Sequence, residues 1–379
     1  MNATYEQWRE WVTDGGWLQP YHQWVNNTNL HRLWSSRIKP GDPRWESCGG
    51  DPYLFTRKVY DWLEGNLDAF LRAVYTSGFE DRGWRALVAT EMDPNTVAST
   101  PINPGYFRNR CYRDIVLCGG DGDRTLSIKD AIVNTLRGEV RKTFTMPAVW
   151  GDIIGGVVSS NTVLTFNKSC KLASVFSPGV YRYLLCRAQR HSGGSSVLFG
   201  TASWGVPVVA AEDCGYNTVG IVDVQDGVLD ACNAIHSERM PQYTLQTYHT
   251  RSEVMDSAVA PGWDHIISCP PYWDLEVYGG SDLQSTTLFQ TYDSWLEGYW
   301  RPTVLASLKL LAPHGVFAFT MGRWVRYQWC AQDMTRIAEE CGLEVIDTVR
   351  IMPRRKTPKL YATSTEKWEE CIYFKRKSQ

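Results

Sequence analysis

Two consecutive prolines, Pro270 and Pro271, follow the apolar run at residues 265–267 closely and are themselves followed by Tyr272. Proline has no N–H and a fixed φ, so the pair cannot continue a strand ladder and holds its carbonyls in a rigid arrangement. A fixed carbonyl acceptor beside an aromatic ring suits the binding of a planar base that carries an exocyclic amine. The segment predicts a catalytic loop, although an isolated Pro-Pro-Tyr is also typical of a turn that ends a strand.

A second group of residues with a chemical role lies upstream, where an apolar strand at residues 195–199 runs into a turn of small residues at 200–205. The apolar stretch 206–211 predicts a helix after this turn. The next predicted strand, residues 218–223, ends in Asp223, roughly 20 residues after the turn, where nucleotide-binding α/β folds carry the acid that binds a ribose. The glycines of the turn match no strict fingerprint, but Asp223 in register favours a nucleotide site.

The order and type of these segments resemble the S-adenosylmethionine-dependent amino-methyltransferases that act on DNA, in particular their phage-type members. The resemblance covers roughly residues 160–379. Residues 269–272, the catalytic loop, are similar to the family's (Asp/Asn/Ser)-Pro-Pro-(Tyr/Phe/Trp) motif, and residues 199–205 resemble its cofactor turn. Residues 176–180 resemble the segment that lies over the methionine part of the cofactor. The resemblance implies methyl transfer from S-adenosylmethionine to the exocyclic amine of adenine or cytosine in DNA, with the base extruded.

The resemblance also implies three groups of site residues. The catalytic positions are Cys269, Pro270, Pro271 and Tyr272. The cofactor-binding positions are Phe176, Ser177, Pro178, Phe199, Gly200, Thr201, Ala202, Ser203, Gly205, Asp223 and Glu253. The substrate-binding positions are Tyr272, Trp273, Asp274 and Glu276. No metal ligand is implied.

Two parts of the site depart from the family pattern. The cofactor turn often carries an acid and a glycine where this chain has Phe199 and Ser203. The first catalytic position holds Cys269, and a neutral thiol is a weak hydrogen-bond acceptor. Because the carbonyls of the proline segment do not depend on that side chain, methyl transfer is the first hypothesis. The alternatives are a catalytically silent methyltransferase-like module that binds nucleic acid or protein, and a methyltransferase that acts on RNA or nucleotides.

Composition agrees with a soluble enzyme. The chain has 379 residues, of which 43% are hydrophobic and 21% charged, and its formal net charge is -2 at pH 7. These values predict two domains, or one domain with a large extension, and no overall basic field for nucleic acid. Basic clusters at residues 350–359 and 375–377 fit either a local nucleic-acid contact or a solvated hairpin and tail.

Cysteine usage and the lack of apolar segments suggest the compartment. Eleven cysteines without a Cys-x-x-Cys pair predict a reducing environment and no zinc site. The sequence shows no secretory signal and no apolar run of about 18 residues, so we expect a protein in the cytoplasm of a bacterial or virus-infected cell, without a membrane span. The oligomeric state stays open.

We predict that residues 1–145, which are rich in tryptophan, form a separate and mostly helical accessory module. Residues 52–75 carry apolar side chains at a 3.6-residue period, which predicts an amphipathic helix. Tryptophans recur through a polar background at Trp8, Trp11, Trp17, Trp24, Trp34 and Trp45. They fit the core of a small helical domain, which we favour, or exposed platforms on which bases stack.

Residues 146–379 alternate between predicted strands and helices, which indicates a mainly parallel sheet covered on both faces. A long helix is expected at residues 288–311, and two final strands at 343–351 and 370–374 predict an antiparallel hairpin. Together with the resemblance, the expected fold is a Rossmann-like methyltransferase with a seven-stranded sheet. Right-handed crossovers would bring the cofactor turn and the catalytic loop to neighbouring carboxyl ends of its strands.

Overall fold

The structure is a computed structural model. It describes residues 5–13, 19–28, 30, 34, 38–76, 116–118, 125–127, 132–133, 136–137, 147–159, 162, 178–239, 241–273, 282–323, 329–351 and 368–378. These residues fall into two compact units, the first ending at residue 162 and the second beginning at residue 178. No helix in these ranges is long and apolar enough to cross a membrane. Nor do the side chains described there form a cluster suited to a metal ion.

The first unit is mostly helical, as predicted. Its elements are α1 (Tyr5–Thr13), α2 (Tyr21–Asn27), α4 (Pro43–Ser47), α5 (Pro52–Thr76), β1 (Val116–Cys118), β2 (Thr125–Ser127) and α11 (Pro147–Gly155). The strands β1 and β2 pair antiparallel. The helix predicted at residues 52–75 is confirmed by α5. The boundary predicted between residues 145 and 146 lies outside the described residues and stays a prediction.

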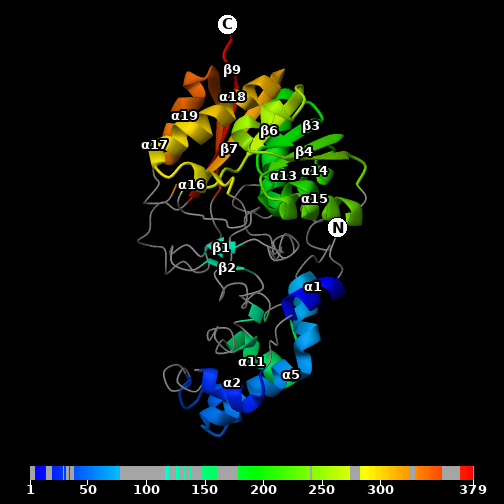
Figure 1. The fold of residues 1–379 in the computed structure, drawn as a ribbon, viewed down its shortest axis with the longest axis vertical. Helices are drawn as coiled ribbons and strands as arrows, with labels where there is room; N and C mark the ends of the chain where they lie inside the picture. Colours follow the sequence, from blue (N-terminus) through cyan, green and yellow to red (C-terminus); the bar gives the residue numbers. More distant parts are fainter. Residues whose placement is uncertain are drawn as a thin grey trace. The chain divides into compact units, whose positions relative to one another are not determined.

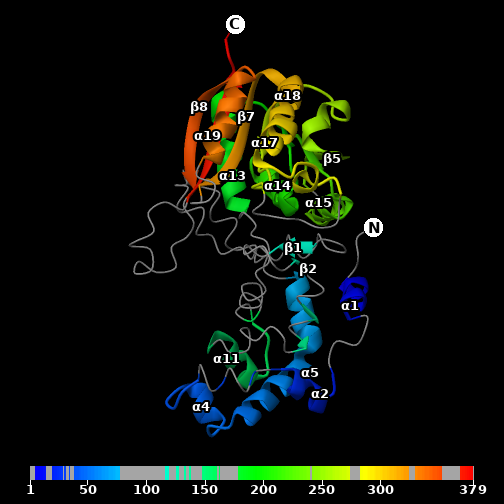
Figure 2. The same cartoon turned by 60° about the vertical axis from the view of Figure 1, so that its left-hand side comes forward.

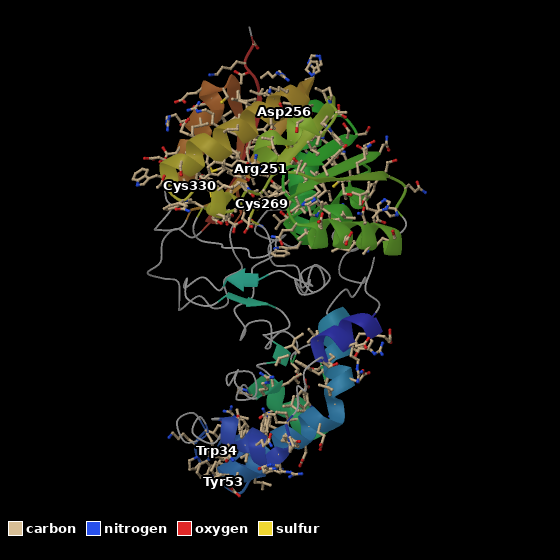
Figure 3. The ribbon with its side chains drawn as sticks, in the orientation of Figure 1. Trp34, Tyr53, Arg251, Asp256, Cys269 and Cys330 are labelled. Atoms are coloured by element: carbon tan, nitrogen blue, oxygen red, sulfur yellow. The ribbon has the colours of Figure 1, made fainter. Side chains whose placement is uncertain are left out.

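Tryptophans form much of the core of the first unit. Trp24 and Trp34 are fully buried, and the rings of Trp34 and Trp45 stack with centroids 5.6 Å apart. Phe55 of α5 stacks on Trp150 of α11 at 5.0 Å between centroids, so α11 packs within this unit. Figure 3 labels Trp34 among these helices. For these residues the core interpretation applies, since buried rings present no face to a base.

The second unit is built on a seven-stranded sheet with the order β5-β4-β3-β6-β7-β9-β8, seen from two sides in Figures 1 and 2. Its strands are β3 (Ser196–Phe199), β4 (Thr218–Asp223), β5 (Thr244–His249), β6 (Trp263–Ser268), β7 (Leu311–Arg323), β8 (Leu343–Ile351) and β9 (Trp368–Arg376). All neighbouring strands are parallel except β9, which runs antiparallel to β7 and β8. This arrangement confirms the expected Rossmann-like methyltransferase fold with its antiparallel final hairpin.

Helices cover both faces of this sheet. They are α13 (Pro178–Ser192), α14 (Val206–Asp213), α15 (Asp226–Arg239), α16 (Ser285–Leu288), α17 (Tyr292–Trp295), the π-helical turn η4 (Leu296–Trp300), α18 (Arg301–Leu310) and α19 (Cys330–Glu340). Successive strand residues point to opposite faces. On β9, the Tyr373 hydroxyl donates to the Leu184 carbonyl of α13 at 3.2 Å, whereas Phe374 belongs to the core under α18 and α19. Helix α14 packs between α13 and α15.

The helix predicted at residues 288–311 is interrupted. After α16 the chain is extended at Phe289, and Thr291 caps a new start at α17. The helix then widens into η4 before it continues as α18. Pro302, in the first turn of α18, has no N–H to donate to the Gly298 carbonyl, which accounts for the wider turn before it.

Three consecutive basic residues at the end of β9 cap three different helices. Lys375 Nζ donates to the His191 carbonyl near the end of α13 at 2.9 Å. Arg376 donates to carbonyls at the end of α18, and Lys377 Nζ donates to the Glu339 carbonyl in the last turn of α19 at 2.6 Å. Cations at the carboxyl ends of helices are stabilising. Each side chain therefore has a structural partner, which neither interpretation of residues 375–377 anticipated.

Candidate active site

The cofactor turn and the catalytic loop are in direct contact. Strands β3 and β6 pair in parallel with Phe199 opposite Ile267, and the Gly200 N–H donates to the Ile267 carbonyl at 3.0 Å. The Thr201 hydroxyl donates to the Cys269 carbonyl at 2.9 Å and accepts from the Cys269 N–H at 3.3 Å. Cys269 is labelled at this edge of the sheet in Figure 3. The predicted meeting of the turn and the loop is confirmed.

The opposite ends of the same two strands are fixed by Asp264. Its Oδ2 accepts from the Ser195 N–H at 2.9 Å, the Ser196 N–H at 3.0 Å and the Ser196 hydroxyl at 2.8 Å. Burial opposes ionisation of Asp264, but these hydrogen bonds hold its pKa below the ordinary value. Gly194, at φ +89°, allows the close approach, since a Cβ there would lie 2.5 Å from the Asp264 side chain. The register of β3 against β6 is thus set at both ends.

The non-glycine residues with positive φ among the described residues all lie in the two site loops. They are Ser203 at φ 41°, Trp204 at φ 64° and Trp273 at φ 42°. The Tyr181 hydroxyl of α13 donates to Ser203 Oγ. The backbone at Ser203 is one that favours glycine, because glycine adopts positive φ without strain. Residues held in such conformations concentrate at functional sites.

Asp223 lies at the carboxyl end of β4, beside the cofactor turn. Its Oδ2 accepts from the Ala202 N–H at 3.1 Å and its Oδ1 from the Gln225 N–H at 3.0 Å. Burial raises the pKa of Asp223 to about 6, while the hydrogen bonds from Ala202 and Gln225 act in the other direction. Each carboxylate oxygen can accept more than one hydrogen bond, so both remain able to bind a ligand hydroxyl.

Glu253 reaches the same edge of the sheet from the 3-10 helix η3 (Ser252–Ser257), which follows β5. The Ser252 hydroxyl donates to the Gly200 carbonyl and so ties η3 to the cofactor turn. Glu253 is buried, and this burial raises its pKa. Arg251 Nε lies 3.4 Å from Glu253 Oε1. Figure 3 labels Arg251 in the same unit as Cys269.

Tyr299 and Tyr181 join this site although the sequence analysis did not select them. Tyr299, 3% exposed, sits on η4. Burial and then the nearby Glu253 raise its pKa, and Asp223 and Cys269 act in the same direction. For Tyr181, burial and then Cys269 raise the pKa. No sequence pattern marks Tyr299, because its direction depends on the extra residue in the π-helical turn.

The main-chain carbonyls of the catalytic loop differ in the hydrogen bonds that they accept. That of Cys269 accepts from Thr201 at 2.9 Å, and that of Pro271 accepts from the Trp273 N–H at 2.8 Å. The carbonyl of Pro270, between them, receives no hydrogen bond from any other described residue. Of these three carbonyls, that of the buried Pro270 is the one to which the other described residues donate no hydrogen bond.

The remaining predicted site residues have varied positions. Pro178 is buried at the start of α13. Tyr272 is 7% exposed and packs in the core cluster, and the Trp273 ring lies 5.4 Å from that of Tyr292. Four of the predicted residues lie outside the described ranges: Phe176, Ser177, Asp274 and Glu276.

Comparisons with known proteins add little to this geometry. No model of a known protein family matches the sequence, and no curated protein sequence matches it. Similar solved structures include a methyltransferase of Pyrococcus furiosus, with 13% identity and a TM-score of 0.38 over 53% of this chain and 83% of that chain. The N-methyltransferase NodS of Bradyrhizobium japonicum, solved with S-adenosyl-L-homocysteine, has 16% identity and a TM-score of 0.37 over 52% and 86%.

A third similar structure is that of the cyclase SpnF, with 11% identity and a TM-score of 0.38 over 54% of this chain and 84% of that chain. Similarity at this level does not separate methyltransferases from a cyclase. The fold of the second unit therefore rests on its strand order, and its chemistry has to be argued from the site.

Proposed function

We propose that the second unit binds S-adenosylmethionine and transfers its methyl group to the exocyclic amine of adenine or cytosine in DNA. The observation that carries the proposal is the contact between the cofactor turn and the catalytic loop through Thr201 and Cys269. This contact leaves the Pro270 carbonyl available at the same edge of the sheet as Asp223. An acceptor for an amine next to a nucleotide site is what such a transfer requires.

The groups around the cofactor turn suit S-adenosylmethionine, which supplies a methyl group on a positively charged sulfur. Asp223 offers carboxylate oxygens to the ribose hydroxyls. The buried Gln225 Oε1 has no hydrogen-bond partner among the described residues and is a further acceptor there. Glu253 suits the adenine amine. Residues 199–205 and the start of α13, with Pro178, would enclose the methionine part.

The loop residues act on the nucleophile. The nitrogen lone pair of an aromatic amine is delocalised into the ring, so the amine attacks poorly until that lone pair is localised. The Pro270 carbonyl, held rigid by the proline pair, would accept a hydrogen bond from one amine N–H and draw the nitrogen toward tetrahedral geometry. The remaining requirement is alignment of the amine with the methyl group. The C–S bond would break as the N–C bond forms, and the methylated nitrogen would lose one proton to solvent, so positioning and electrostatics supply the catalysis. Cys269 is not assigned as a covalent nucleophile.

The base must leave the duplex to reach this loop. Tyr272 is assigned to stacking on the base, a contact worth about 1–3 kcal/mol. Because the Tyr272 side chain is 7% exposed, its ring gains a free face only if the loop adjusts when the base enters. Trp273, Asp274 and Glu276 are the further proposed contacts of the substrate. The choice of DNA rests on the resemblance of residues 269–272.

Transfer of label from the cofactor tests the proposal. The whole protein is incubated with methyl-labelled S-adenosylmethionine and, separately, with unmethylated DNA, RNA and nucleotides, and the products are digested and identified by mass. We expect methylated adenine or cytosine in the DNA, and much less of it with Tyr272→Ala.

If the label appears only in RNA or in nucleotides, methyl transfer stands as the reaction and DNA is wrong as the substrate. Absence of label in every pool, with the cofactor bound, would favour a binding module instead.

A further inference from the structure

We propose that Thr201 is a positioning residue whose hydroxyl clamps the catalytic loop to the cofactor turn. Its effect on catalysis rests on the proposed function, whereas the clamp itself does not. The family resemblance places Thr201 among the cofactor contacts. The hydrogen bonds of its side chain instead reach across to the next strand's loop.

The clamp supplies hydrogen bonds that the main chain cannot. The ladder between β3 and β6 includes the bond from the Gly200 N–H to the Ile267 carbonyl, and Pro270 has no N–H with which to extend it. At that point Thr201 Oγ1 both donates to the Cys269 carbonyl and accepts from the Cys269 N–H. One hydroxyl thus pairs both main-chain groups of the half-buried residue before the prolines.

The clamp also bears on which carbonyl is left to accept from the substrate. Because Thr201 uses one lone pair of the Cys269 carbonyl, the carbonyl of Pro270, to which the other described residues donate no hydrogen bond, is the acceptor that we assign to the amine. Because Thr201 belongs to the cofactor turn, the same hydroxyl fixes the distance between the methyl donor and that acceptor. A displacement of about 1 Å at such a point can lower a rate on the order of a hundredfold.

Loss of the hydroxyl should loosen the site without unfolding the sheet. The amino ends of β3 and β6 are held independently by Asp264 and Ser196. The strands between these ends are buried and paired in register. A defect at Thr201 should therefore appear in kcat for methyl transfer rather than in the affinity for the cofactor.

The test compares Thr201→Val, which keeps the shape and removes the hydroxyl, with Thr201→Ser, which keeps the hydroxyl. Thr218→Val, at the start of β4 and away from both loops, is the matched control. We expect Thr201→Val to lower kcat on the order of ten- to a hundredfold, with unchanged cofactor affinity by calorimetry. Thr201→Ser and Thr218→Val should remain close to wild type. If Thr201→Val does not fold, Thr201→Ala serves in its place.

Amide exchange gives a readout that needs no turnover. Residues 269–271 contain a single exchangeable amide, that of Cys269, because both prolines lack one. We expect this amide to exchange faster in Thr201→Val than in Thr201→Ser or wild type. If the amide of Cys269 exchanges faster in Thr201→Val but the wild type transfers no methyl group, the clamp stands and the proposed function is refuted.

If Thr201→Val shows the same amide exchange at Cys269 and the same kcat as the wild type, the clamp is overturned. A parallel loss of cofactor affinity and rate would also overturn it, since the hydroxyl would then act on the cofactor.

Discussion

At the edge of the sheet that carries the candidate site, single side chains supply hydrogen bonds that the main chain cannot make. Thr201 pairs with both main-chain groups of Cys269, and Tyr181 holds the hydroxyl of Ser203, which has a left-handed backbone. Asp223 accepts from the main chain of the cofactor turn. The geometry of the site therefore depends on a few polar contacts, and changes at single residues should separate binding from turnover.

Cofactor binding should weaken as Asp223 becomes protonated. Burial raises its pKa to about 6, so the ionised acceptor for the ribose hydroxyls is lost as the pH falls through that value. We expect the dissociation constant for S-adenosylmethionine to rise from about pH 8 to about pH 5. Asp223→Asn cannot ionise and should bind more weakly, with no such pH dependence. Calorimetry across this range checks both, and a flat wild-type profile would remove Asp223 from the cofactor site.

Replacement of Cys269 should be tolerated. If the Pro270 carbonyl activates the amine, Cys269→Ser should preserve or raise the rate of methyl transfer, because a hydroxyl is a better acceptor than a thiol. Tyr272→Ala should lose most activity, since the stacking surface for the base is gone. Initial rates with labelled cofactor measure both variants. A severe loss in Cys269→Ser with normal stability would mean that the thiol itself takes part.

At the scale of helices and strands, bounds set by apolar runs could be predicted and bounds set by caps could not. β4 and β8 begin and end where expected, because a short apolar run between polar residues specifies a buried strand. β9 extends two residues beyond the predicted 370–374 at each end, where pairing with its neighbours continues past the apolar run. The break before α17 and the π-helical turn η4 depend on Thr291 and Pro302, whose effects are absent from periodicity. For this reason the position of Tyr299 does not follow from the sequence. The meeting of the cofactor turn and the catalytic loop does follow from it, because each directly follows a buried strand.

A pair of cysteines lies between α13 and the end of α14, and one of the two thiols should be reactive. Cys186 and Cys214 have sulfurs 3.5 Å apart. The hydrogen bond with Cys214 lowers the pKa of Cys186 to about 6, burial opposes this shift, and Arg182 adds to it. Since thiolates are the reactive form, iodoacetamide should label Cys186 at neutral pH, with a rate that rises through about pH 6.

Peptide mass spectrometry of the labelled protein measures this rate. Cys214→Ser should move the midpoint to higher pH. Cys232 and Cys371 serve as internal controls, because burial raises their pKa and they should stay unlabelled in the folded protein. Labelling of Cys186 only in alkaline solution would contradict the assignment.

At the scale of the whole chain, two compact units with separate cores should unfold in two transitions. S-adenosylmethionine should raise the midpoint of one transition only, that of the second unit. Trp150→Ala removes the ring that stacks on Phe55. It should lower the free energy of unfolding of the first unit by about 3–5 kcal/mol, and with it the midpoint of that unit's transition. Scanning calorimetry measures both. Trp329→Ala, at a residue that is 62% exposed, is the control and should move neither midpoint. A single joint transition would refute the division of the chain into two units.

The helix caps at the end of β9 have a consequence for how the second unit meets a polyanion. The carboxyl ends of α13, α18 and α19 carry partial negative charge, and Lys375, Arg376 and Lys377 lie against them. Because the partial charge at a helix end is about half a unit, the helix ends offset only part of the positive charge of these residues. Since β9 runs antiparallel to β7, these residues lie at the edge of the sheet opposite the catalytic loop. On the proposed function, a nucleic acid that reaches the catalytic loop would therefore lie at the opposite ends of the strands from Lys375, Arg376 and Lys377.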